Sequence, residues 1–158
     1  MRRISAEYLY DGGSSEPLRN AYVEVADDGT VLAVGKVENP EAEPEFHKGA
    51  IVPGFVNTHC HLELSYLKGK FRKGTGMAGF IDQINEMRDT SSMEEKKADI
   101  AFWMNEMWKR GVTAMGDISN CSDTFECKAD SPMYTRTFLE VFGTEPQDCQ
   151  DVIDNVFE

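Results

Sequence analysis

The sequence predicts an α/β fold in which a parallel sheet follows a small antiparallel unit. Beyond residue 50, apolar segments alternate with amphipathic helical segments, a pattern typical of parallel strands covered by helices. Before residue 38, short segments of alternating apolar and polar residues are separated by turn signals. Between the two patterns lies a polar stretch with two prolines, residues 38–45, which indicates a linker or loop.

The antiparallel unit has three predicted strands. They cover residues 2–10, 19–25 and 30–37, and the Asp-Asp-Gly sequence at 27–29 supplies a tight turn between the last two. So few short strands bury too little apolar surface to fold alone. We therefore expect this unit to pack on another part of the protein.

The alternating part begins with a buried strand over residues 50–58, in which Pro53 must lie at the start or at a bulge because proline cannot donate to a ladder. Apolar residues at helical spacing predict a helix around residues 80–87. A longer helix over 93–110 begins with a Ser-x-x-Glu capping box and ends before a glycine.

The same alternation continues toward the end of the chain. Buried strands are predicted over 112–118 and 135–142, with a looser segment between them. Pro146 then opens a last helix, whose apolar positions are Cys149, Val152, Ile153 and Val156.

Composition narrows the classes of function. The 158 residues carry a net charge of −12, whereas nucleic acids and anionic membranes bind basic surfaces. No apolar run is long enough to span a bilayer, and no signal peptide is visible. These features argue against nucleic-acid and membrane partners. The cysteines lack CxxC spacing, which predicts reduced thiols in a cytoplasmic protein: Cys60, Cys121, Cys127 and Cys149.

Two of the three histidines end the first buried strand of the alternating part. Side chains two apart on a strand point to one face, so His59 and His61 project together while Cys60 points away. Sites form at the carboxyl ends of such strands. Two imidazoles can share one divalent metal, with Zn–N contacts of about 2.0–2.1 Å, and zinc makes water a nucleophile near neutral pH. The alternative is that both histidines only cap the strand.

Two other motifs lack the context they need. His61-Leu62-Glu63 matches the H-x-E of zinc nucleobase deaminases, but no P-C-x-x-C follows it. The glycines of residues 74–79 match G-x-G-x-x-G, but no buried strand precedes them. A flexible glycine-rich loop is the better interpretation of that segment.

The stretch from Ile51 to Leu62, IVPGFVNTHCHL, resembles the first barrel strand of the amidohydrolase superfamily. The continuation HLELS with YLKGK, and RGVTAMGDIS at 110–119, resemble its chlorohydrolase and nucleoside deaminase branch, notably aminodeoxyfutalosine deaminases. The resemblance implies a partial (β/α)8 TIM barrel, the first three or so βα units, over residues 50–158. It also implies that residues 1–49 are part of a small β-sandwich that precedes the barrel.

The resemblance implies that His59 and His61 are two ligands of one zinc or iron ion. Family members take further ligands from histidines near the fifth and sixth strands and an aspartate at the eighth, but no histidine follows His61 here. A full barrel needs about 250 residues. We therefore expect the amino-terminal part of a longer hydrolase, inactive by itself and binding metal weakly or incompletely.

The resemblance further implies that the parent protein acts on a small-molecule substrate, and we expect it to deaminate an aminopurine nucleoside or related ring with metal-activated water. Glu63 and Ser65 are candidate substrate contacts, with a solvated loop as the alternative for both. Asp117 either orients a ligand histidine or, more simply, caps a helix or turn. A hydrolase of the same superfamily acting on a C–Cl or cyclic amide bond remains open.

A third hypothesis is a non-catalytic α/β domain that associates with itself. Three parallel strands leave open edges and uncovered apolar faces, which favour a homo-oligomer. Metal content and mass in solution separate this hypothesis from a hydrolase.

Overall fold

A computed structural model describes residues 1–37, 44–141, 150, 151, 153 and 154. The chain divides into two compact units, Met1–Pro53 and Gly54–Glu158. In the described part of the chain, no helix is long and apolar enough to cross a membrane.

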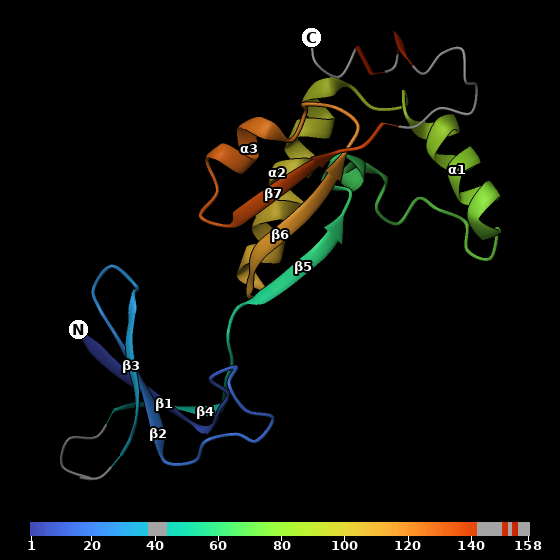
Figure 1. The fold of residues 1–158 in the computed structure, drawn as a ribbon. Coiled ribbons are helices and arrows are strands. Elements are labelled where there is room, and N and C mark those ends of the chain that lie inside the picture. Colours follow the sequence, from blue (N-terminus) through green and yellow to red (C-terminus); the bar gives the residue numbers. More distant parts are fainter. Residues whose placement is uncertain (38–43, 142–149, 152, 155–158) are drawn as a thin grey trace. The chain divides into compact units, whose positions relative to one another are not determined.

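The first unit is a four-stranded sheet in the order β3-β2-β1-β4. Its strands are β1 (Arg2–Leu9), β2 (Ala21–Val25), β3 (Val31–Lys36) and β4 (Glu45–Ile51). β1, β2 and β3 pair antiparallel as the sequence predicts, whereas β4 pairs parallel with β1 (Figure 1). These four strands form one sheet, so the β-sandwich stays a prediction.

β4 corrects the prediction of a single strand over residues 50–58. Residues 50 and 51 belong to β4, and a new strand, β5, begins only at Phe55. Pro53 therefore lies between two strands, where its missing N–H breaks no ladder. His47 lies within β4, and its ring nitrogen is 2.9 Å from a carboxylate oxygen of Glu45.

The second unit holds a parallel sheet in the order β5-β6-β7 with helices between the strands, as predicted. A short helix, α3, occupies the segment that the sequence leaves without a helix. The helix predicted from Pro146 falls largely outside the described residues. The elements are β5 (Phe55–Cys60), the 3-10 helix η2 (Leu62–Leu67), α1 (Gly76–Met87), α2 (Met93–Lys109), β6 (Val112–Ser119), α3 (Phe125–Ala129) and β7 (Tyr134–Leu139).

The predicted boundaries of α2 are confirmed by their caps. Ser92 accepts the backbone N–H of Glu95 at 3.3 Å, and the Glu95 carboxylate accepts the backbone N–H of Ser92 at 2.8 Å. Gly111 follows the helix with φ of 86°, a left-handed conformation in which glycine is unstrained. β6 can therefore start directly after α2.

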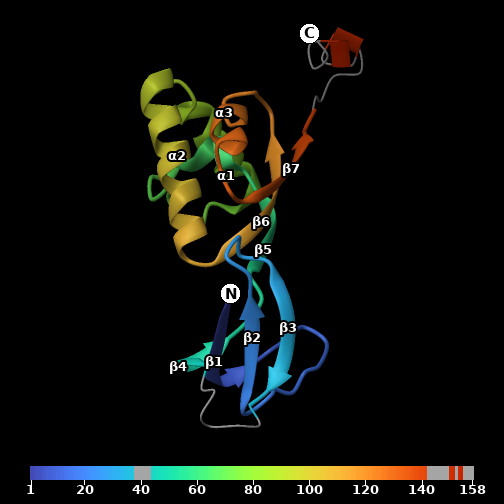
Figure 2. The same ribbon diagram turned by 90° about the vertical axis from the view of Figure 1, so that its left-hand side faces the viewer.

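α2 and α3 cover one face of this sheet (Figures 1 and 2). The core beneath them joins η2, α2, β6 and the segment before β7 through five buried residues: Leu62, Ile100, Met104, Met115 and Met133. A second cluster packs α1 against η2 through Tyr66, Leu67 and Ile84. η2 thus lies between two cores, which fixes the segment that follows β5.

The opposite face of the same sheet carries exposed apolar side chains. Val56 and Tyr134 both pair with Ala114, and Phe138 pairs with Ile118. These strand positions alternate with the buried residues of β6 that face the helices. Val56, Tyr134 and Phe138 are 62%, 70% and 50% exposed, so within the described residues this face has no covering layer.

Candidate metal and substrate site

His59 and His61 lie side by side at the carboxyl end of β5. His59 is within the strand, and His61 directly follows it as the N-cap of η2. Their ring centres are 5.3 Å apart and the rings are tilted by 55°. His59 is exposed and the His61 side chain is 33% exposed, so solvent reaches both. The predicted pair of neighbouring, accessible imidazoles is present.

The strand reaches this arrangement through an irregularity. Asn57 pairs with Met115 and Cys60 pairs with Asp117, so β5 takes three steps where β6 takes two. His59 lies in this bulge, and Cys60 packs against the core under α2. Simple alternation along a strand predicts that the two histidines share a face, but it does not predict the bulge. Bulges of this kind redirect side chains next to functional sites.

Asp117 of β6 anchors the segment that begins at His61. It is fully buried, and its Oδ1 accepts the backbone N–H of Leu62 at 2.8 Å. Its other oxygen accepts the Thr124 hydroxyl at 3.4 Å and forms an ion pair with the buried Lys128. The capping role considered for Asp117 is thus the one that its contacts support. Lys128 and Thr124 were not among the sequence-predicted site residues.

Glu63 is buried beside His61. It is 7% exposed, and its Oε1 lies 3.6 Å from Nδ1 of His61. Burial raises the pKa of the Glu63 carboxyl, the charge of Asp117 acts in the same direction, and the His61 ring opposes both. A solvated loop is therefore not the environment of this side chain.

Ser65 lies in η2, two residues further along. Its hydroxyl donates to the carbonyl of Leu62 at 2.7 Å, so the hydroxyl proton already forms a hydrogen bond within η2. The oxygen keeps lone pairs that could accept a hydrogen bond. Contact of Ser65 or Glu63 with a substrate stays a prediction.

A polar hollow of about 210 Å³ adjoins Glu63. It lies between η2, the end of α1, the start of α2 and the loop after β6. Tyr66 forms part of its wall, donating to the carbonyl of Arg88 at 3.1 Å. Side chains of both charges line it together with an amide: Arg88, Asp89, Lys96, Asp123 and Asn120. Such a hollow suits a small polar ligand.

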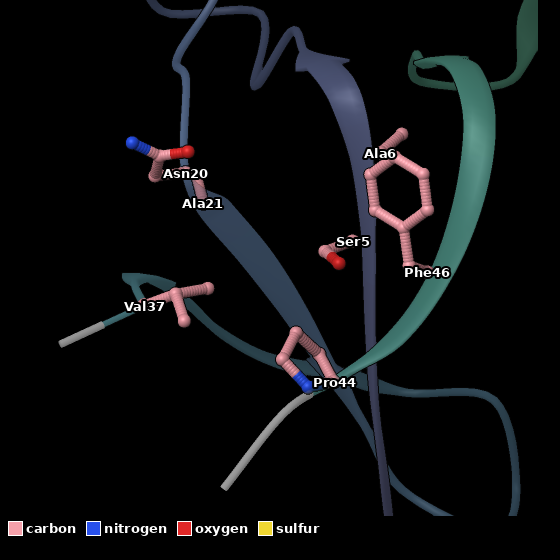
Figure 3. Close-up of a pocket in the computed structure, with 7 residues that line it drawn as sticks. All are labelled: Ser5, Ala6, Asn20, Ala21, Val37, Pro44 and Phe46. Carbon is pink, nitrogen blue, oxygen red and sulfur yellow. The ribbon is translucent and has the colours of Figure 1, made fainter. Parts of the chain in front are cut away.

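A larger hollow, of about 400 Å³, lies in the first unit. Figure 3 shows that Ser5 and Ala6 from β1, Ala21 from β2 and Phe46 from β4 border it. Its described lining contains no titratable or metal-binding side chain.

The two histidines fit part of a metal site. Two imidazoles on one tetrahedral zinc, each at about 2.0–2.1 Å, have ring centres roughly 5 Å apart, which agrees with the observed 5.3 Å. Over residues 1–37 and 44–141, and the few described beyond them, no group of three or more His, Cys, Asp or Glu side chains could hold an ion. A catalytic zinc site usually has three protein ligands, so His59 and His61 supply a partial set.

No protein-family model matches the chain. The 5-methylthioadenosine/S-adenosylhomocysteine deaminase of Natronomonas pharaonis is 29% identical over 93 residues, which cover 59% of this chain and 22% of that protein. The aminodeoxyfutalosine deaminase of a Nitratiruptor species is 29% identical over 126 residues, which cover 76% and 31%. The chain thus spans less than a third of the length of these relatives.

Solved structures share the fold. Helicobacter pylori aminofutalosine deaminase in complex with methylthio-coformycin superposes with a TM-score of 0.74 at 21% identity, over 98% of this chain and 39% of that chain. Atrazine chlorohydrolase of Arthrobacter aurescens, complexed with zinc, gives a TM-score of 0.67 at 17% identity, over 100% and 44%. At these identities the likeness concerns the fold.

Proposed function

We propose that the chain belongs to the amidohydrolase superfamily and supplies the first metal-binding segment of a metal-dependent hydrolase. We further propose that this hydrolase is a deaminase of an aminopurine nucleoside or a related ring. The observation that carries the proposal is the pair of adjacent, solvent-accessible imidazoles at the carboxyl end of β5. Deaminases among the relatives support the reaction class.

The metal of this proposal is a divalent ion, zinc first and iron second. His59 and His61 would hold it, and ligands outside the described residues would complete the set. A bound zinc ion supplies Lewis acidity and lowers the pKa of water toward ~7. A zinc complex among the solved neighbours supports the choice. With these two ligands among the described residues, we expect the isolated chain to bind metal weakly and to be inactive.

The residues around the pair take distinct roles in this proposal. Asp117 holds the backbone at Leu62 and so sets the position from which His61 projects. Glu63 and Ser65 contact the substrate, and the adjoining polar hollow accepts its hydrophilic part. No general acid or base is assigned within the chain.

The architecture proposed for residues 50–158 is the first part of a (β/α)8 barrel, with residues 1–49 contributing to a small β-sandwich. The exposed apolar face of the β5-β6-β7 sheet supports this, because a barrel would bury that face in its interior. A strand order that follows the chain order is also what a barrel requires.

A second candidate reaction is hydrolysis of a C–Cl or cyclic amide bond. The atrazine chlorohydrolase among the structural neighbours is the reason for considering it. The same pair of histidines would serve either reaction. The difference lies in the groups that recognise the leaving group.

Self-association is proposed for the isolated chain, because the open sheet face offers apolar side chains to a second copy. A cytoplasmic location also stays a proposal. The described cysteines, Cys60, Cys121 and Cys127, are free thiols, which suits a reducing compartment.

The function is tested on the protein encoded by the reading frame that contains this sequence. We expect zinc-loaded protein to release ammonia from adenosine or 5-methylthioadenosine, and the His59→Ala and His61→Ala variants to lose this activity. Chloride release from atrazine without ammonia release would favour the second candidate. If folded, metal-loaded protein releases neither ammonia nor chloride, both candidate reactions are refuted.

A further inference from the structure

Three buried polar atoms lie close together at His61 and Glu63. They are Nδ1 of His61 and both carboxylate oxygens of Glu63, and none has a hydrogen-bond partner among the described residues. Oε1 of Glu63 is 3.6 Å from Nδ1 of His61, and the Glu63 side chain is only 8% exposed. Buried polar atoms almost always have a partner, because leaving one unmet costs its desolvation energy. A hydrogen bond from Nδ1 of His61 to Oε1 of Glu63 would give two of these three atoms a partner.

The backbone that carries both groups is held firmly. Leu62, between them, is 1% exposed, and its N–H is bound by the buried Asp117. The separation of 3.6 Å exceeds a hydrogen bond of about 2.7–3.2 Å. Small side-chain rotations close that gap without moving the backbone, and hydrogen bonds in such sites are commonly longer before a ligand binds.

We propose that Glu63 is a positioning residue that fixes the tautomer of His61. Its Oε1 accepts the proton of Nδ1, so that Nε2 keeps the free lone pair. A neutral imidazole has one donor and one acceptor nitrogen, and the partner of one decides the role of the other. Nε2 is then the nitrogen that His61 presents to a cation. Carboxylates in this role also orient the ring and increase its basicity.

The inference deepens the proposed function, since it rests on His61 as a metal ligand. It concerns a property of the metal-free chain, however, and does not depend on activity. It accounts for Oε1 of Glu63, while Oε2, which is also buried, keeps no partner among the described residues.

The first test is nitrogen-15 NMR of the imidazole side chains in the metal-free chain, at a pH well above the ordinary histidine pKa of ~6.5. We expect His61 to carry its proton on Nδ1. Glu63→Leu removes the acceptor and should shift His61 toward the Nε2-protonated form. The matched control is Ser65→Ala, which disturbs η2 without removing the carboxylate and should leave the tautomer unchanged.

The second readout is zinc affinity, measured by competition with a chromophoric chelator. The variant for this measurement is Glu63→Gln, which keeps the size of the side chain and removes the carboxylate. Loss of the orienting carboxylate should weaken zinc binding by about 10–100-fold. An Nε2-protonated His61 in the unsubstituted chain would overturn the proposal even if every variant failed to fold. An unchanged tautomer in folded Glu63→Leu would overturn it as well. A correct tautomer in a protein without deaminase activity would leave this inference standing and refute only the reaction.

Discussion

At the scale of single residues, the ion pair between Asp117 and Lys128 shows why part of the site cannot be predicted from the sequence. The histidine pair is local in sequence and ends a strand, so its residue types and spacing suffice to predict it. Asp117 and Lys128 come from different elements, and lysine is rarely buried. Their ion pair depends on the packing of α3 over β6 and β7, where Lys128 also donates to the Thr137 hydroxyl at 2.9 Å. Only the fold brings them together.

Removing the charge of Asp117 should destabilise the protein strongly. We expect Asp117→Asn to lower the free energy of unfolding by about 3–5 kcal/mol, because Lys128 would stay buried without its counter-charge. Urea denaturation measures the loss. The control is the double variant Asp117→Asn with Lys128→Met, in which both charges are gone and most stability should return. Equal losses in the single and double variants would show that the ion pair is not the cause.

Cys127 gives a pH-dependent prediction. Burial raises the pKa of its thiol, and the neighbouring Lys128 opposes the shift. We expect iodoacetamide to alkylate Cys127 more slowly in the folded chain than in urea near the ordinary thiol pKa of ~8.5. The contribution of the Cys127 thiol to the free energy of unfolding is fully present below this ordinary thiol pKa. It is lost as the pH rises through the raised pKa of Cys127 in the folded chain. Peptide mass spectrometry gives the two rates, and equal rates would contradict the shift.

At the scale of elements, α1, α2 and the parallel strands were predictable, whereas η2, α3 and β4 were not. α2 has a capping box and a terminal glycine within its own sequence. β4 follows a polar stretch, alternates poorly and is mostly exposed. It is a strand because its backbone pairs with β1, some forty residues earlier, and that pairing has no local signal. The same lack of local signal hides the bulge that holds His59.

Gly116 of β6 lets β5 approach next to His59. A Cβ atom there would lie 2.8 Å from the backbone oxygen of Thr58, closer than atoms can pack. We expect Gly116→Ala to cost about 1–3 kcal/mol of unfolding free energy and to weaken zinc binding, since β5 must shift. Gly13→Ala, where a Cβ meets only ordinary contacts, is the control. Unchanged stability and zinc affinity in Gly116→Ala would show that the close approach is unimportant.

At the scale of the whole molecule, the uncovered sheet face predicts association of the isolated chain. We expect sedimentation to show species larger than a monomer, and Phe138→Ser to reduce them, because Phe138 is 50% exposed on that face. Phe102→Ser changes a similarly exposed phenylalanine on α2 and should have no such effect. A monomer at all concentrations would contradict the prediction.

The central claim is that His59 and His61 coordinate one cation together. It is tested most directly by zinc titration of the isotope-labelled chain, followed by NMR of the imidazole nitrogens. We expect both rings to respond together, with one zinc ion per chain, and His59→Ala to abolish the response of His61. Independent responses of the two histidines, or a response of only one, would contradict the account.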